Sequence, residues 1–231
     1  MNKGIQKIFA EVPDTYETVN HVLTFFMDIA WRRKAVRQAA RCGGSRWIDM
    51  CSGTGETAAL LTHNARNGTR VFAADFSLPM LSKAQAKPEG PSIRFVSSDI
   101  AHLPFEEGTF DVITISFATR NINLNRDALI QTFREFNRVL KPGGHFINLE
   151  TSQPSIGILK KLFHFYIKLF VKPVGKLISG SRAGYTYLSQ TIPAFYPALE
   201  LSDIMETAGF SRVRFKKLFL GIAAIHRGEK R

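Results

Sequence analysis

The sequence predicts an α/β fold in which a mostly parallel, seven-stranded sheet carries helices on both faces. Between about residues 46 and 151, short apolar runs rich in Ile, Val and Phe alternate with segments of helical periodicity. Continuous apolar runs of this kind are typical of parallel strands that are buried on both faces. Two further strand-like runs, bent around Gly221, follow near the C-terminal end and predict a closing antiparallel hairpin.

The first 45 residues are expected to form a helical cap, because residues 16–41 show apolar periodicity and end in a basic run. We assign residues 46–231 to the α/β domain. Within it, residues 152–199 interrupt the alternation of strands and helices, and we expect them to form an inserted lid. We find no internal repeat or low-complexity tract.

Within the α/β domain, the first five strands are expected at RWIDM, RVFAADF, IRFVSSD, FDVITISFA and GHFINLE. The helices between them are expected at residues 55–66, 78–87 and 127–141. The second of these helices begins after Ser77, a good N-cap, with Pro79 just inside it. After the lid, residues 200–210 are expected to form a helix that ends at Gly209, and residues 211–228 supply the last two strands.

The chain is strongly basic, with 31 Lys and Arg against 19 Asp and Glu and a net charge of +12. Such an excess suits nucleic acid, an anionic membrane or an anionic ligand. The sequence shows no appended RNA-binding module and no basic platform rich in aromatic residues, which argues against nucleic acid. No Cys, His or Asp spacing suggests a metal site.

Several features predict a cytoplasmic protein. The two cysteines suggest a reducing compartment, and the first residues lack the apolar core of a secretory signal. The most apolar stretch, LFHFYIKLFV, is far shorter than the roughly 20 residues that a membrane-spanning helix needs. A position peripheral to the inner face of the cell membrane stays open, as does a homodimer.

A glycine loop, Gly53-x-Gly55-x-x-Ala58, joins the first expected strand to the first helix of the domain. Glycines permit a tight turn that exposes backbone N–H groups beside a helix N-terminus, where a pyrophosphate or a carboxylate can bind. Asp75, at the end of the next strand, is placed to accept both hydrogen bonds of a ribose diol. This pairing suits NAD and any other cofactor that carries adenosine.

Two acidic residues favour S-adenosylmethionine over NAD as the cofactor. Asp49, just before the loop, is placed to meet the ammonium of a methionine moiety and would repel a pyrophosphate. Asp99 ends the third strand, where it can reach the exocyclic amine of an adenine, although a helix N-cap explains it equally well. The final hairpin also replaces the second mononucleotide-binding half that an NAD site usually has.

The chain resembles a known family. The segments DMCSGTGE, AADFSLPML, LPF, FDVITISFATRN and REFNRVLKPGG are similar to motifs of class I methyltransferases, which have a Rossmann-like fold. A more selective set comprises ITISFATRN, RVLKPGGHFINLETSQP, YTYLSQTIPAF and AGFSRV with GIAAIHRG. It resembles the ubiquinone/menaquinone biosynthesis C-methyltransferases, which methylate a polyprenylated quinol ring. The opening segment also matches that family at Tyr16, Asn20 and Trp31, so the similarity covers nearly the whole chain.

The resemblance implies roles for individual residues. It implies that S-adenosylmethionine is contacted by Thr54, Asp75, Asp99, Ile100 and Ser116. It also implies that Arg120 and Asn121 border the reacting ring.

The chain departs from the family pattern at several positions. Glu56 stands where aspartate is commoner, and Ala118 replaces a usual glycine. Asp28 and Ile29 stand where the family commonly has His-Arg, and Gln190 stands where glutamate is frequent. The last three changes keep open a different hydrophobic acceptor, such as another phenol or a sterol-like lipid. A quinone-binding protein without turnover is a further alternative, against which the intact glycine loop argues.

Methylation of a quinol ring needs a base for the hydroxyl proton and a donor beside the developing oxyanion. Arg120 suits the second role, because it follows the end of a strand and stays protonated. His226 is the best-placed candidate for the base, although a lone histidine at a strand end is more often structural. Tyr185 and Tyr187 are expected either to orient the quinol or to pack the lid.

The lid contains no acidic residue, and lysines alternate there with large apolar side chains. One interpretation is that the lid encloses an isoprenoid tail and that residues 152–182 dock on an anionic membrane. An ordinary core helix with a solvated lysine face is the alternative. A substrate that resides in the bilayer favours the first interpretation.

Overall fold

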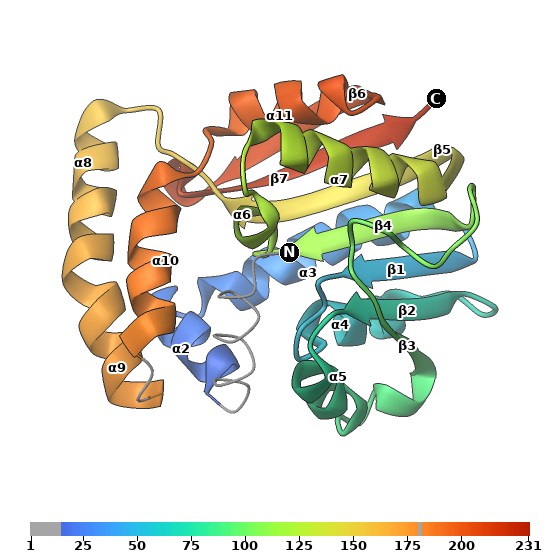
Figure 1. Cartoon of the computed structure of the whole chain (residues 1–231), viewed down its shortest axis with the longest axis horizontal. Helices are drawn as coiled ribbons and strands as arrows, with labels where there is room; N and C mark the ends of the chain where they lie inside the picture. Colours follow the sequence, from blue (N-terminus) through green and yellow to red (C-terminus); the bar gives the residue numbers. More distant parts are fainter. Residues whose placement is uncertain (1–14, 180–181) are drawn as a thin grey trace.

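The computed structural model describes residues 15–179 and 182–231. Its centre is a single seven-stranded sheet with the strand order β3-β2-β1-β4-β5-β7-β6. All neighbouring strands from β3 to β5 are parallel, whereas β7 is antiparallel to both β5 and β6. The predicted mostly parallel sheet with a closing antiparallel hairpin is therefore confirmed (Figure 1).

The strands lie close to the predicted positions. They are β1 (Arg46–Met50), β2 (Arg70–Asp75), β3 (Ile93–Ser97), β4 (Phe110–Ser116), β5 (Leu140–Thr151), β6 (Phe210–Leu218) and β7 (Ala223–Lys230). The largest difference is in β5, which begins four residues earlier than expected, because Leu140 pairs with Phe110 before a register shift in the ladder.

The helices of the α/β domain follow the strands in the expected alternation. They are α4 (Glu56–Asn64), α5 (Leu78–Gln85), the short 3₁₀ helix η1 (Gly90–Ser92), α6 (Thr119–Ile122), α7 (Arg126–Val139) and α11 (Ala198–Thr207). Ser77 is the N-cap of α5 as predicted, but its hydroxyl makes no capping hydrogen bond. Between β6 and β7, the 3₁₀ turn η3 (Phe219–Gly221) ends at Gly221 with a φ of 92°.

Both faces of the sheet are buried, as the continuous apolar strands predict. Within β1, Trp47 packs with residues of the cap helix α3 (Met27–Cys42) and of α4, whereas Ile48 packs on the opposite face with residues of α7 and α11. Two apolar cores therefore lie on either side of the sheet. They hold the carboxyl ends of its parallel strands at one edge.

The cap and the lid meet beyond that edge. The cap contributes α2 (Tyr16–Leu23) and α3, and the lid contributes α8 (Gly157–Tyr166), the π-helical turn η2 (Ile167–Val171), α9 (Lys172–Ser179) and α10 (Arg182–Ala194). A third apolar cluster joins the two parts through Val19, Ile167, Val171 and Tyr185. The lid helices stand beside α2 at the end of the sheet toward which β4 points (Figure 1). No helix among the described residues has the length and apolarity needed to span a membrane.

Candidate active site

The glycine loop is held in place by the carboxylate at the end of β2. Asp75 Oδ2 accepts a hydrogen bond from the Gly53 N–H at 2.9 Å, and its Oδ1 accepts one from the Ser77 N–H at 2.8 Å. Burial raises the pKa of Asp75, and these backbone N–H donors oppose the rise. Each oxygen retains a second lone pair, so the carboxylate can still accept hydrogen bonds from a diol.

The two glycines of the loop have different structural roles. Gly53 lines a polar cavity and has a φ of 55°, and a Cβ built on it would meet no atom within 4 Å. Gly55 has a φ of 82°, and its Cβ would lie only 2.8 Å from Ala84 Cβ. Gly53 therefore leaves room for a ligand, whereas Gly55 lets α4 begin close against α5.

The polar cavity, which we call the donor cavity, lies between the glycine loop and the end of β4. Thr54, Asp75, Ser116 and Asn121 line it together with Gly53. The Ser116 hydroxyl and the Asn121 Oδ1 are buried and have no hydrogen-bond partner. Buried polar atoms normally have hydrogen-bond partners, so these two unpaired atoms fit a cavity that binds a polar ligand.

A separate cleft lies beside α7, next to the donor cavity. Asn121 and Ile122 line both spaces, and Asp99 and Ile100 line the cleft. Asp99 is exposed, and its Oδ1 accepts a hydrogen bond from the Ala101 N–H at 3.0 Å. The predicted donor residues Thr54, Asp75 and Ser116 thus line one space, and Asp99 and Ile100 line a neighbouring one that shares Asn121 and Ile122 with it.

Asp49 is not among the residues that line the donor cavity. It is buried within β1 and accepts a hydrogen bond from the Thr114 hydroxyl of β4 at 2.7 Å. Burial, opposed in part by this hydrogen bond, raises the pKa of Asp49 to about 6. The structure therefore places Asp49 within the sheet next to the glycine loop, and its contact with a methionine ammonium stays a prediction.

A second, apolar cavity of about 330 Å³ lies between the cap, the lid and η3. We call it the acceptor cavity. Its apolar lining includes Trp31, Phe163, Leu188 and Phe219. The charged residues among its described lining are Asp28, Arg32 and Arg120. Such an enclosure suits a ligand that is mainly apolar and has a few polar groups.

Arg120 reaches the acceptor cavity from α6 and is held by a buried ion pair. Its Nη1 lies 3.0 Å from Glu150 Oε1 and donates to the Thr151 hydroxyl at 3.3 Å, and its backbone N–H donates to Glu150 Oε2. The Arg120 Nε is buried without a partner. The predicted position of Arg120 beside an apolar acceptor is therefore supported by geometry. Its neighbour Asn121 lines the donor cavity and is not among the residues that line the acceptor cavity, so its position beside the ring stays a prediction.

The remaining predicted residues do not line the acceptor cavity. His226 is buried against α11, where its Nε2 lies 2.8 Å from the Ala198 carbonyl oxygen, and burial lowers its pKa to about 4. That placement contradicts its role as a base for the substrate. Tyr185 is buried in the cap–lid cluster, so it packs the lid. Tyr187 is half-buried; burial raises its pKa, and the charges of Arg120 and Glu150 act on it.

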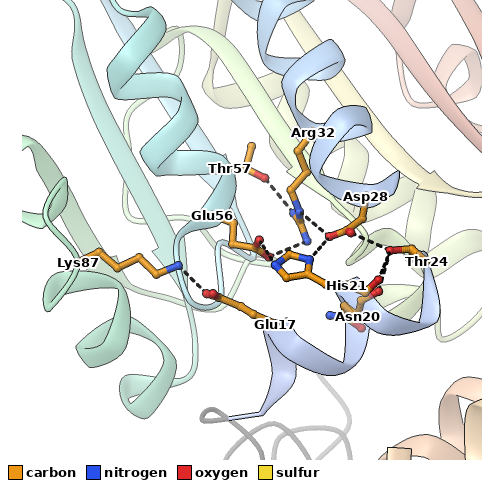
Figure 2. Close-up of polar contacts among 9 residues, drawn as sticks. All are labelled: Glu17, Asn20, His21, Thr24, Asp28, Arg32, Glu56, Thr57 and Lys87. Atoms are coloured by element: carbon orange, nitrogen blue, oxygen red, sulfur yellow. Dashed lines mark hydrogen bonds and ion pairs between the residues drawn. The ribbon is translucent and has the colours of Figure 1, made fainter. Parts of the chain in front are cut away.

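A polar network that sequence reasoning missed joins the cap to the glycine-loop helix (Figure 2). Arg32 is its centre: Nη1 donates to the Thr57 hydroxyl at 3.0 Å and Nη2 lies 3.2 Å from Glu56 Oε2. Its guanidinium carbon also lies 5.0 Å from the centre of the Phe117 ring. Arg32 lines both the donor and the acceptor cavity, so it marks their junction.

The same network brings together potential metal ligands. Atoms of Glu17, His21 and Glu56 lie within 4.8 Å of one another. Glu17 is already paired with Lys87 at 2.5 Å, and Glu56 is already paired with Arg32. Because cations of the chain itself neutralise both carboxylates, we interpret this cluster as an ion-pair network.

The strand order and the glycine loop held by Asp75 are those of a class I methyltransferase that depends on S-adenosylmethionine. Solved structures agree on the fold. A S-adenosylmethionine-dependent methyltransferase from Thermotoga maritima aligns with a TM-score of 0.62 at 17% identity, covering 94% of this chain and 98% of that one. One from Aquifex aeolicus aligns with a TM-score of 0.58 at 17% identity, covering 84% and 88%.

Within this class, the chain belongs to the ubiE/COQ5 methyltransferase family, which matches residues 1–230. It is 38% identical over 225 residues to a demethylmenaquinone methyltransferase of Thermus thermophilus, covering 96% of this chain and 100% of that protein. It is 34% identical over 227 residues to a ubiquinone/menaquinone biosynthesis C-methyltransferase of Desulfotalea psychrophila, covering 98% and 90%. The family expected from the motifs is confirmed.

Proposed function

We propose that this enzyme transfers the methyl group of S-adenosylmethionine to a ring carbon of a polyprenylated quinol, with a demethylmenaquinol-type naphthoquinol as the first candidate. The observation that carries this proposal is the meeting of two unlike cavities at Arg32. One is lined by several polar side chains and lies next to a second cleft; the other is mainly apolar and is lined by Arg120, whose Nε has no partner. The names of the relatives support a quinone acceptor.

The donor cavity suits S-adenosylmethionine because several of its groups can still form hydrogen bonds with a ligand. Asp75 has spare lone pairs for the ribose diol, and the Ser116 hydroxyl and Asn121 Oδ1 are without partners. Asp99 and Ile100 line the cleft where an adenine would extend. When bound, the cofactor supplies an electrophilic methyl group on a sulfonium.

The acceptor cavity must raise the electron density of the quinol ring and exclude water. We propose that Arg120 stabilises the phenolate oxygen; in support, it lines the acceptor cavity and its buried Nε has no hydrogen-bond partner. Glu150 fixes the guanidinium from behind, which limits the reorganisation needed during reaction. The surrounding apolar side chains strengthen this electrostatic interaction by keeping the local dielectric low.

The entrance to the acceptor cavity suits a substrate that arrives from a bilayer. Apolar residues of its lining are strongly exposed at Phe25 (70%), Leu162 (59%), Phe219 (55%) and Leu220 (65%). Helix α8 has no buried residue, and exposed lysines flank the apolar side chains of the lid. We therefore include docking on an anionic membrane through residues 152–182 in the proposal.

The central test is product formation. The enzyme is incubated with S-adenosylmethionine and a reduced demethylmenaquinone, and mass spectrometry detects a single added ring methyl. Absence of methylated quinol, with cofactor binding confirmed by calorimetry, would refute the quinol assignment and favour another hydrophobic phenol or a sterol-like acceptor. We expect Asp75→Ala to abolish cofactor binding, and Arg120→Ala to leave cofactor binding intact while it stops turnover.

The membrane proposal has a separate test. Flotation of the enzyme with liposomes should depend on anionic lipid and should weaken when Lys160, Lys161 and Lys168 are replaced by Gln. Each lysine near the surface contributes about 1 kcal/mol of attraction. Equal flotation with neutral and anionic liposomes would contradict the proposal. Arg33→Gln and Lys34→Gln, which change exposed cations on α3, serve as matched controls.

A further inference from the structure

We propose that Asp28, paired with His21, is the base that accepts the hydroxyl proton of the acceptor. This inference rests on the proposed function and replaces the role that the structure denies to His226. Asp28 belongs to α3 and His21 to α2, so the pair lies within the cap (Figure 2).

The placement of Asp28 is unusual for a carboxylate. Its residue exposure is 1%, and it lines the acceptor cavity. A buried carboxylate is costly unless hydrogen bonds compensate, and Asp28 receives two. His21 Nδ1 lies 2.8 Å from Oδ2, and the Thr24 hydroxyl donates to Oδ1 at 2.7 Å. Its remaining lone pairs can accept a proton or a hydrogen bond from a ligand.

The charged groups around the pair are defined by the structure. Arg32 Nε lies 3.9 Å from Asp28 Oδ2, and its Nη2 is paired with Glu56. His21 Nε2 lies 3.4 Å from Glu56 Oε1, so the imidazole stands between two carboxylates. The His21 ring therefore has a carboxylate oxygen within 3.4 Å of each of its nitrogens.

Within the acceptor cavity, the charged lining among the described residues consists of Asp28, Arg32 and Arg120. Arg32 and Arg120 are guanidiniums and stay protonated, so neither can act as a base. Asp28 is the carboxylate among the described lining residues, and Arg120 lines the same cavity with a buried Nε that has no partner. The cavity thus presents a proton acceptor and an oxyanion donor to one substrate, as methylation of a phenol ring requires.

The proton and electron balance is simple. The quinol O–H bond breaks, its electron pair stays on oxygen beside Arg120, and the proton goes to the Asp28–His21 pair. The ring carbon then forms a bond to the methyl group, and the S–CH₃ bond breaks with its electrons going to sulfur. The ring carbon loses its own hydrogen as a proton, which restores aromaticity. The quinol oxygen regains a proton from the pair, so one proton in total is released.

The experiment measures kcat, KM and cofactor affinity of the intact enzyme with a reduced demethylmenaquinone between pH 6 and pH 9.5. We expect Asp28→Asn to lower kcat by about 10²- to 10⁴-fold at pH 7, the usual contribution of a general base. Affinity for S-adenosylmethionine should change less than threefold. Asp28→Glu should recover part of the loss, and Asp203→Asn, an exposed residue of α11, should have no effect.

The pH profile separates catalysis from structure. Without the base, the quinol must ionise into solvent, and a phenol has a pKa of about 10. The kcat of Asp28→Asn should therefore rise about tenfold per pH unit, so that its deficit against the unaltered enzyme shrinks as pH increases. A merely structural role would lower the rate by one constant factor at every pH.

Three outcomes would overturn the assignment: a kcat within threefold of the unaltered enzyme, a deficit that does not change with pH, or a loss confined to KM. If Asp28→Asn does not fold, His21→Gln provides the second variant. Its kcat should be about 10-fold lower than that of the unaltered enzyme at pH 7, and this difference should also shrink as pH increases. A flat His21→Gln deficit would refute the pair. Inactivity of the unaltered enzyme toward the quinol would refute the proposed function instead.

Discussion

The buried ion pair between Arg120 and Glu150 allows a quantitative prediction for Glu150→Gln. The side chains are only 6% and 0% exposed, and Glu150 accepts from two groups of Arg120 and two of Thr151. Removing one partner of such a pair leaves an uncompensated buried charge and costs about 3–5 kcal/mol. For a chain of this size, each kcal/mol lowers the unfolding midpoint by about 2–4 °C, so the expected fall is about 6–20 °C.

Thermal unfolding followed by circular dichroism measures this fall in the enzyme without ligand. The control is Glu200→Gln, which removes the partner of Arg126 in an exposed pair with 45% exposure on both sides. That change should cost less than about 1 kcal/mol. Arg120→Met combined with Glu150→Gln should recover most of the midpoint, because an apolar side chain replaces the buried charge. A Glu150→Gln midpoint within 2 °C of the unaltered enzyme would refute the reasoning.

Three further predictions follow from single residues. Gly55→Ala should destabilise the fold by more than 1 kcal/mol in urea unfolding, because the new Cβ meets Ala84 at a positive φ; Gly68→Ala, also at positive φ but in open space, is the steric control. Asp49 has a pKa of about 6 in the folded chain against an ordinary value of 3.8, so its protonated form stabilises the fold below pH 4 and that contribution is lost as pH rises through 6. Over this pH range, the free energy of unfolding measured with urea should fall by about 3 kcal/mol in the unaltered chain because of Asp49. Asp49→Asn should lack this contribution. His226→Gln should keep kcat within threefold, and the unaltered chain should lose the stability contributed by neutral His226 as pH falls from 6.5 toward 4. A hundredfold fall in kcat for His226→Gln would restore its role as the base.

The sequence was sufficient for the sheet because its signals are local. Continuous apolar runs mark strands that are buried on both faces, and the glycine loop with Asp75 marks where the carboxyl ends of β1 and β2 meet a ligand. Each signal depends on a few neighbouring residues and on the general geometry of parallel sheets. The largest strand error arose where a pairing partner extended a strand, at Leu140 in β5, and the short helix α6 (Thr119–Ile122) was not predicted.

The direction in which a single side chain points was harder to predict from the sequence. Arg120 and Asn121 are adjacent in the chain, yet one faces the acceptor cavity and the other faces the donor cavity, because successive residues of a helical turn point in different directions. His226 sits at a strand position that suits catalysis, but its side chain projects toward α11 and bonds a backbone carbonyl. Such directions depend on register and packing.

By itself, the sequence determined the class of fold, the cofactor and the family, because these follow from residue spacing along continuous segments. Only the tertiary structure decided which charges surround the acceptor. In the sequence, Asp28 is only a departure from the family pattern. No motif predicted a role for His21 or Arg32. Folding places the cap on the glycine-loop helix and against the lid, so residues far apart in the chain enclose one apolar cavity. Such long-range contacts leave no periodicity in a single sequence.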